Sequence, residues 1–167
     1  MNDAIRLKKL EEKDLSQVKD IYNYYIENST GTFHTSLVSE NELKEILPVG
    51  DKRFRSFLIY FDNLVVGYCY LGRYKNRAAY DRTAEVTIYL KPEFFGKGIG
   101  REVLQQMEQK ALEVDIFVLL GIITAENEAS IKLFERMGYE KCGHFKQVGE
   151  KFGRILDVVA YQKLLEQ

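Results

Sequence analysis

Cysteine is scarce in this chain of 167 residues, and its scarcity argues against two classes of site. The two cysteines, Cys69 and Cys142, lie far apart and form no C-x-x-C pair. The sequence therefore indicates neither a disulfide framework nor a zinc site. The two histidines, His34 and His144, have no third metal ligand at a suitable spacing, so we expect no metal ion.

Proline is also scarce, and the sequence has no long apolar run and no excess of one charge. Only Pro48 and Pro92 occur, with no repeat or linker, so we expect a single domain over residues 1–167. No run approaches the roughly 20 apolar residues that span a bilayer, and the N-terminus lacks an apolar signal core. We therefore expect a cytoplasmic protein that binds no membrane. The 24 basic and 25 acidic residues nearly cancel, which argues against nucleic acid as a partner.

Strand and helix patterns alternate along the chain. Ile5 and Leu7 alternate with basic residues, as in a half-buried strand, and apolar residues at helical spacing follow Asp14. The order of the elements predicts an α/β (α+β) fold, a mixed sheet with helices on its faces. The further elements that we expect are a short helix capped by Ser39, strands over 55–61, 64–73 and 84–90 with a turn at Asp62–Asn63, a helix over 99–112, a strand over 117–123, a helix closed at Gly138, and strands over 141–148 and 154–162.

A glycine-rich turn, FFGKGIGREVL at positions 94–104, lies between an expected strand and an expected helix. Neither the dinucleotide fingerprint G-x-G-x-x-G nor the triphosphate loop G-x-x-x-x-G-K-[ST] fits its spacing. Gly96, Gly98 and Gly100 instead leave backbone amides bare at the start of a helix, which suits a diphosphate. Lys97 and Arg101 add positive charge at the rim. The glycines alone are equally consistent with a tight turn that binds nothing.

A second stretch, NEASIKLFERMGY at positions 127–139, follows one helix and one strand later. Together the two stretches resemble the acyl-CoA-binding core of the GNAT N-acetyltransferase superfamily. The resemblance implies a GNAT fold with about seven strands and acetyl-CoA as co-substrate, with its pyrophosphate at the turn over 95–100. Phe95 departs from the family, which usually has Gln or Arg there. Further cofactor contacts that the resemblance implies are Thr87, Ile88 and Tyr89 beside pantetheine, Gly96, Lys97, Gly98, Ile99, Gly100 and Arg101 at the turn, and Asn127, Ser130 and Phe134 on the later helix.

Two of these cofactor residues have competing roles. Asn127 has amide groups that can hydrogen-bond pantetheine, but asparagine is equally suited to cap the helix. Phe134 occupies the position where many members of the superfamily have a tyrosine as general acid, and phenylalanine cannot donate a proton. We therefore expect Phe134 to be a core residue or a pantetheine contact.

Three further segments, at positions 21–33, 73–90 and 149–158, resemble one branch of the superfamily, the phosphinothricin acetyltransferases. Members of that branch acetylate the α-amino group of phosphinothricin, methionine sulfoximine, methionine sulfone or related amino acids. The branch also implies a homodimer. Two alternatives remain open at this stage: an acetyltransferase for another amine, such as a polyamine, a protein N-terminus or an aminoglycoside, and a catalytically silent acyl-CoA-binding module.

Glu85 is the candidate catalytic residue. Acetyl transfer needs a deprotonated amine, and a carboxylate, directly or through water, can remove the proton. Glu85 matches the glutamate of the family strand that leads into the glycine turn. On position alone an outward-facing strand residue would be favoured, and the resemblance reverses that preference.

Basic residues crowd the segment before Glu85, namely Arg73, Lys75, Arg77 and Arg82, with Tyr74 and Tyr80 between them. Arginine can bind a carboxylate or phosphinate through two parallel hydrogen bonds. By resemblance, the acceptor-binding residues are Lys75, Arg77 and Tyr80, with Phe33 as an aromatic wall. The alternative is a solvated basic loop.

Overall fold

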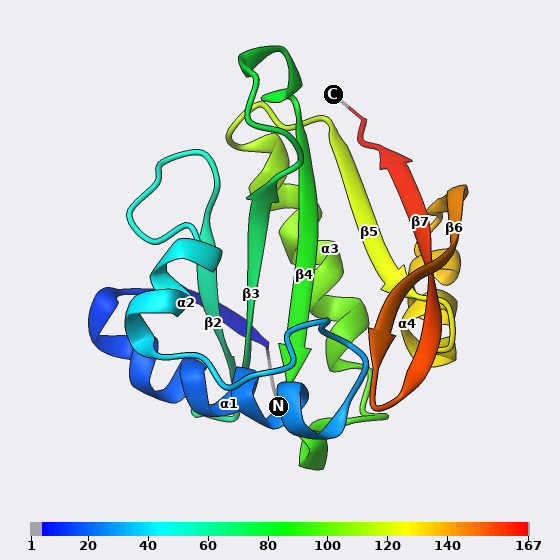
Figure 1. Cartoon of the computed structure of the whole chain (residues 1–167). Coiled ribbons are helices and arrows are strands. Elements are labelled where there is room, and N and C mark those ends of the chain that lie inside the picture. The colour runs from blue at the N-terminus through cyan, green and yellow to red at the C-terminus, as the bar shows by residue number, and fades with distance from the viewer. Residues whose placement is uncertain (1–4, 167) are drawn as a thin grey trace.

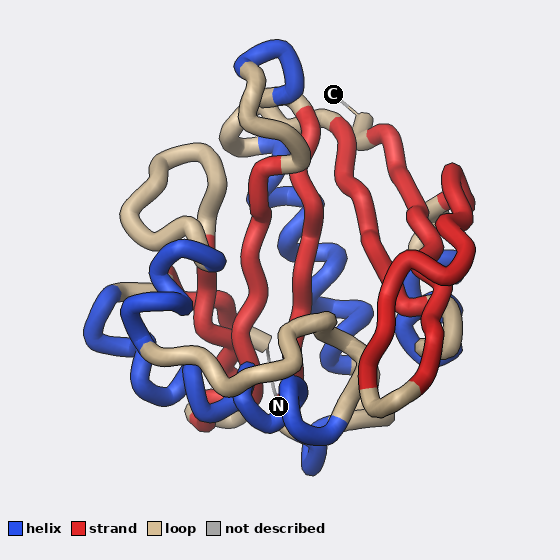
Figure 2. Tube along the Cα trace, in the orientation of Figure 1, coloured by secondary structure: helices blue, strands red, loops and turns tan. Residues whose placement is uncertain are grey.

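One sheet of seven strands organises the chain. The computed structural model describes residues 5–166 (Figures 1 and 2). The strands, which pair in the order β1-β2-β3-β4-β5-β7-β6, are β1 (Arg6–Lys9), β2 (Ser56–Phe61), β3 (Leu64–Arg73), β4 (Thr83–Leu90), β5 (Val118–Thr124), β6 (Glu140–Lys151) and β7 (Arg154–Leu164). The helices are α1 (Leu15–Asn28), α2 (Glu40–Ile46), α3 (Ile99–Leu112) and α4 (Glu128–Arg136), with short 3-10 turns η1 (Glu12–Asp14), η2 (Ala78–Tyr80) and η3 (Pro92–Phe94).

The expected mixed sheet of about seven strands with flanking helices is confirmed. Ser39 accepts a hydrogen bond from the Glu42 amide and so caps α2 as expected. Asp62 and Asn63, both at positive φ, form the tight turn between β2 and β3. The last two strands are longer than predicted, because β6 is a largely exposed edge strand whose polar ends carry no clear alternation.

The helices form two layers, one on each face of the sheet (Figure 1). Apolar residues of α1 and α2, such as Val18 and Leu43, pack with Leu58 and Tyr68 on one face. Apolar residues of α3 and α4 form a second core on the other face, shared with alternate residues of β3, β4 and β5. Because strand side chains alternate between faces, Ala84 and Val86 point to the α3 side. Glu85, Thr87 and Tyr89 therefore point to the α1 side.

The pairing of β4 with β5 positions the functional site. It is the one parallel pair of the sheet, and α3 makes the crossover that parallel strands require. The ladder contains only three register pairs, from Thr83↔Val118 to Glu85↔Leu120. Beyond these pairs both strands continue, but they diverge, and a gap opens between their carboxyl ends (Figure 1).

Among residues 5–166, none of the helices combines the length and the apolar character needed to cross a bilayer.

Candidate functional site

A cleft of about 1120 Å³ occupies the split between β4 and β5. Other parts of the chain complete its walls: the end of α1 with the segment after it, Tyr70 of β3, the glycine turn with the first turn of α3, α4, and the tip of the β6–β7 hairpin. Strand, helix and loop backbones therefore all meet at one hollow. This is the arrangement expected of a binding site for an elongated ligand.

The glycine turn closes one end of this cleft. Gly96 and Gly98 both have positive φ, 73° and 77°, a conformation that L side chains rarely adopt. Gly98 is also the residue before α3, so the first amides of that helix lack partners within it. Above both glycines, no atom lies within 4 Å of where a Cβ would stand. The turn thus needs glycine for its shape and also leaves its amides uncovered toward the cleft, where an anion can bind them.

Most of the predicted cofactor residues meet in the cleft. Two of them, Lys97 and Ile99, do not line it. Lys97 is exposed beside the turn, and the Ile99 side chain is buried in the core. At Ile99, therefore, only the backbone can face the anion-binding amides of the glycine turn, which we call the cradle. Phe95, which departs from the family pattern, lies on the cleft wall and is half exposed. The predicted residues that line the cleft are Thr87, Ile88, Tyr89, Gly96, Gly98, Gly100, Arg101, Asn127, Ser130 and Phe134.

The backbone of β4 presents polar groups to the cleft beyond the last pair with β5. The Lys91 amide donates to the Val66 carbonyl, on the β3 side. Since the polar groups of successive strand residues alternate between the two edges, the Ile88 amide points to the opposite edge, into the cleft. The sequence predicted that the main chain of Thr87 to Tyr89 runs beside pantetheine. Of these three residues, the alternation shows that Ile88 is the one whose amide faces the cleft.

Asn127 and Phe134 have clear structural roles on α4. The Asn127 side chain accepts a hydrogen bond from the Ser130 amide at 3.2 Å and caps the helix, while it also lines the cleft. The Phe134 ring lies so close to Gly121 of β5 that a Cβ there would be 2.6 Å from it. The Phe134 ring also contacts the Tyr139 ring edge to face, with 4.8 Å between the ring centroids. Phe134 is therefore a core residue that also forms part of the cleft wall.

Glu85 lies at the last β4–β5 register pair, where the split begins. Burial raises the pKa of its carboxyl above the usual value, and the charge of Lys75 lowers it in part. Gly72 stands directly opposite Glu85 on β3 and offers no side chain to cover it. The neighbouring Tyr70 has its pKa raised to about 12 by burial and lines the cleft. Glu85 itself does not line the cleft, whose wall begins with its neighbours Val86 and Tyr70. Its partly desolvated carboxylate lies next to the cleft, on the α1 side of the sheet.

The predicted acceptor residues lie elsewhere. The loop between β3 and β4, which holds Lys75, Arg77 and Tyr80, extends from the end of the sheet opposite the glycine turn (Figure 1). None of the three lines the cleft. Within residues 5–166, Lys75 and Arg77 form no ion pair, whereas Arg73 pairs with Asp81 at 2.8 Å. Neither charge therefore has an ion-pair partner among the described residues, although the Lys75 charge acts on the Glu85 carboxyl from a longer distance.

Phe33 lies on the α1 side of the molecule, away from that basic loop. Its ring covers Gly149 of β6, where a Cβ would be 2.4 Å from the ring. The structure therefore separates the four predicted acceptor residues into two groups. Glu85 lies near the basic loop by sequence, and Phe33 belongs to the segment that follows α1.

Sequence reasoning missed a large part of the cleft wall. Ser29, Thr30 and Gly31 lie in the stretch 21–33 that carries the branch resemblance, but no role was predicted for them. The donors to their backbone carbonyls, Lys151, Thr124 and Tyr89, are all distant in sequence. Tyr70 reads as an ordinary strand residue. Phe152 at the hairpin tip has a φ of 54°, which is unusual for a bulky side chain, but a sequence does not report φ.

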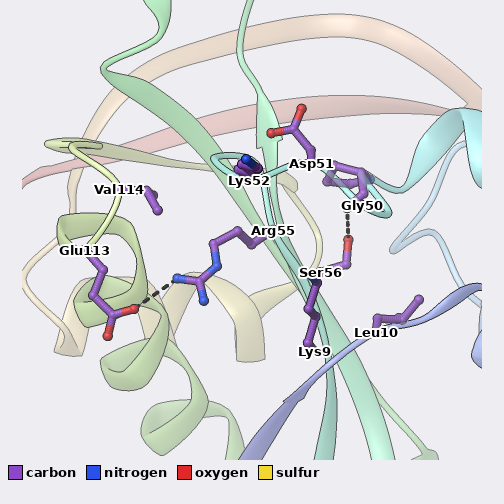
Figure 3. A pocket seen from close by; sticks show the side chains of 10 residues that line it. Lys9, Leu10, Gly50, Asp51, Lys52, Arg55, Ser56, Glu113 and Val114 are labelled. Atoms are coloured by element: carbon purple, nitrogen blue, oxygen red, sulfur yellow. Dashed lines mark hydrogen bonds and ion pairs between the residues drawn. The ribbon is translucent and has the colours of Figure 1, made fainter.

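A second hollow, of about 330 Å³, lies near the carboxyl end of α3 (Figure 3). Several of its polar groups already have partners: Arg55 pairs with Glu113 at 3.0 Å, and the Ser56 hydroxyl donates to the Pro48 carbonyl. None of the predicted site residues lines it. The larger cleft is therefore the candidate site.

Comparisons with known proteins agree with this choice. The model of the acetyltransferase (GNAT) domain family matches residues 7–160. The phosphinothricin N-acetyltransferase of Streptomyces coelicolor is 30% identical and is matched over 92% of each chain. The crystal structure of ribosomal-protein-alanine N-acetyltransferase from Brucella melitensis is 34% identical, with a TM-score of 0.86 over 97% of this chain and 99% of that one. A phosphinothricin acetyltransferase from Sinorhizobium meliloti, crystallised with acetyl-CoA, is 28% identical, with a TM-score of 0.89 over 96% and 88% of the two chains.

We predict that Gly98→Val weakens binding of coenzyme A, the diphosphate ligand expected from the sequence. A side chain there would occupy the open space above the turn, and it would also strain a left-handed backbone by about 1–2 kcal/mol. Gly50→Val is the matched control, because Gly50 has a φ of 83° and equally open surroundings but lies outside the cleft. Calorimetric titration should show a loss of affinity for Gly98→Val alone. Equal affinities in both folded variants would remove the turn from the site.

Proposed function

The chain belongs to the GNAT acetyltransferase family, and from that premise we propose that it transfers the acetyl group of acetyl-CoA to the α-amino group of a small amino acid. One observation carries the proposal. A single strand, β4, leads from the glycine turn at one end to the half-buried carboxyl of Glu85 near the other. Leu90 and Glu85 are separated by roughly 16 Å at the usual rise of a strand. A ligand held by its diphosphate and carrying its reactive group on a long arm, as acetyl-CoA does, suits that separation.

In the proposed reaction the amine attacks the thioester carbonyl carbon. The new N–C bond forms, the C–S bond breaks, and the sulfur leaves with the bonding electron pair. Glu85 accepts the proton of the amine, directly or through one water molecule. Its raised pKa brings its proton affinity closer to that of the amine, which favours this transfer at neutral pH.

The amide of Ile88 is the group that we assign to the carbonyl oxygen. It faces the cleft beyond the last pair with β5, so it is available where negative charge develops in the transition state. Phe134 has no proton to give to the leaving sulfur. Because a free thiol has a pKa of about 8.5, the thiolate is a tolerable leaving group and needs no dedicated acid from α4.

The proposed acceptors are amino acids with a second anionic group, of the phosphinothricin or methionine sulfone type. The unpaired charges of Lys75 and Arg77, on the loop next to Glu85 in sequence, support this class. A protein N-terminus is the second candidate, because the Brucella ribosomal-protein-alanine N-acetyltransferase is 34% identical to this chain. Both acceptors offer an α-amino group, and they differ in whether a free carboxylate lies beside it.

We also propose that the protein acts as a homodimer, as the phosphinothricin acetyltransferase branch implies. Phe145, Val148 and Ile155 of the β6–β7 hairpin are each more than half exposed, and an apolar surface of this kind favours association. The expected mass in solution is twice 19.5 kDa, measured by light scattering. A monomer at micromolar concentration would contradict the proposal.

Glu85→Gln should lower turnover by roughly 10²- to 10⁴-fold, the range for loss of a general base. Acetyl-CoA affinity should change little, because Glu85 is remote from the cradle. In the parent enzyme, activity should fall as the pH drops through the pKa of Glu85, which lies above the usual 4.5, since only the carboxylate accepts the proton. Turnover of Glu85→Gln near the parent level from pH 6 to 9 would reduce Glu85 to a structural residue.

Release of free thiol from acetyl-CoA over a panel of amines tests the function itself. Phosphinothricin and methionine sulfone should be good acceptors, and spermidine and an alanine-ended peptide poor ones. Arg77→Ala should lower the catalytic efficiency with anionic acceptors roughly 10- to 150-fold, the equivalent of a charge-assisted hydrogen bond of about 1.5–3 kcal/mol. Arg77→Lys should restore part of this loss, because it keeps the charge without the planar fork.

Acceptors without an anionic group should respond little to either change at Arg77. If Arg77→Ala lowered the catalytic efficiency equally for all amines, Arg77 would contribute to folding or to coenzyme binding and not to acceptor recognition. Better turnover of the peptide than of any free amino acid would favour the protein N-terminus, and binding of coenzyme A without turnover of any amine would favour the silent module.

A further inference from the structure

The segment that follows α1, residues 29–34, crosses the mouth of the split between β4 and β5 and reaches the β6–β7 hairpin (Figures 1 and 2). We call residues 29–34 the strap. Both strands that border the split hold it directly. The Tyr89 hydroxyl of β4 donates to the Gly31 carbonyl at 3.1 Å, and the Thr124 hydroxyl of β5 donates to the Thr30 carbonyl at 2.5 Å. The strap thus connects two strands that have no ladder between them at this level.

Glu126, in the turn between β5 and α4, fixes the strap from a third direction. Its carboxylate accepts a hydrogen bond from the Thr30 hydroxyl at 2.6 Å. The same carboxylate accepts two more from the Arg154 guanidinium, at 2.6 and 3.0 Å. These bonds lower the pKa of Glu126 to about 2, so it is charged at any working pH. One carboxylate therefore joins the strap, the β5–α4 turn and the start of β7.

Lys151, the last residue of β6, holds the strap from the hairpin. Its side chain is only 3% exposed, and its ammonium donates to the Ser29 carbonyl at 2.6 Å and to the Thr32 carbonyl at 2.8 Å. No ion pair of residues 5–166 includes Lys151, and the ring of Phe152 lies 5.0 Å from its nitrogen. A buried cation is costly without partners, so these two carbonyls are what stabilises its charge. The strap and the lysine therefore hold each other in place.

The strap lies on the acceptor side of the sheet. Tyr89, which bonds to it, points to the same face of β4 as Glu85, because the two residues are an even number of positions apart. An amine that reaches Glu85 must occupy that face. The cradle, by contrast, is formed by backbone at the start of α3, in the layer on the opposite face.

We infer that Lys151 and Glu126 are positioning residues, which act through the strap to fix the wall against which the acceptor amine lies. Ser29, Thr30 and Gly31 line the cleft and are also the strap residues whose backbone these contacts hold. This inference rests on the proposed function. Its consequence is a division of labour in which the glycine turn determines coenzyme affinity and the strap determines productive binding of the acceptor.

The test is Lys151→Met, which keeps the length and the apolar part of the side chain and removes the donor. We expect the kcat/KM for methionine sulfone to fall roughly 10- to 100-fold, since a misplacement of about 1 Å can cost 10²-fold. Most of the change should be in the KM of the acceptor, with the Kd of acetyl-CoA within about threefold of the parent. Amide hydrogen exchange in residues 29–34 should become faster.

Lys163→Met is the matched control. Lys163 is partly buried and, like Lys151, donates to a backbone carbonyl, that of Met137 at 2.8 Å. It differs in pairing with Glu108, and it lies where β7 meets α4, away from the strap. Lys163→Met should lower thermal stability without changing the KM of the acceptor or the amide hydrogen exchange of the strap. Glu126→Gln, which keeps an acceptor for Thr30 and loses the charge that binds Arg154, tests the strap should Lys151→Met fail to fold. We expect it to act in the same direction and more weakly.

The outcomes separate the inference from the function on which it rests. Unchanged acceptor kinetics in folded Lys151→Met, an equal loss of acetyl-CoA affinity, or the same acceptor defect in Lys163→Met would each overturn the positioning role. If the parent acetylates no amino acid, the proposed function fails instead. Faster exchange of the strap in Lys151→Met would then still support the tether, and unchanged exchange would overturn that as well.

Discussion

The short ladder between β4 and β5 is the constraint on which the rest of the structure depends. After three register pairs the strands separate, which leaves unpaired backbone groups on both inner edges. Unpaired polar groups on a strand edge are a cost unless something else binds them. Here the opened edges are used as walls of the cleft, and the strap and α4 cover what remains. The split is therefore tolerated because other parts of the chain, and in the proposed function a coenzyme, replace the missing ladder.

The parts of the site that could be predicted from the sequence are those whose chemistry lies in one continuous stretch. The glycine turn and the Asn127 helix each lie within about a dozen residues, so local patterns were sufficient to predict their structure, while their role as cofactor contacts was predicted from the family resemblance. Glu85 was reachable only through a family resemblance, because strand alternation alone does not separate a buried carboxylate from a surface one. Its raised pKa depends on what covers it, which is a property of the fold.

The strap could not be predicted for a different reason. Lys151 and Ser29 are 122 positions apart, and a lysine at the end of an exposed edge strand normally points to solvent. Likewise, the end of the β4–β5 ladder leaves no trace in either strand, since both continue with the same apolar pattern after they separate. Long-range pairings of this kind are decided by how the sheet twists and by which loops reach across it, not by the composition of either partner.

The glycine turn follows β4 directly, and Glu85 lies within β4. In the proposed function, this strand therefore sets the distance between the bound diphosphate of the coenzyme and the reacting carbonyl. That distance can change only in steps of two residues, or about 6.6 Å, since a shift of one residue would turn Glu85 from the α1 face to the α3 face. The reach of the enzyme along its coenzyme therefore cannot drift gradually through insertions in this strand. Any change in the length of the acyl group that it accommodates has to come from the side chains and loops around β4, while the strand itself keeps its length.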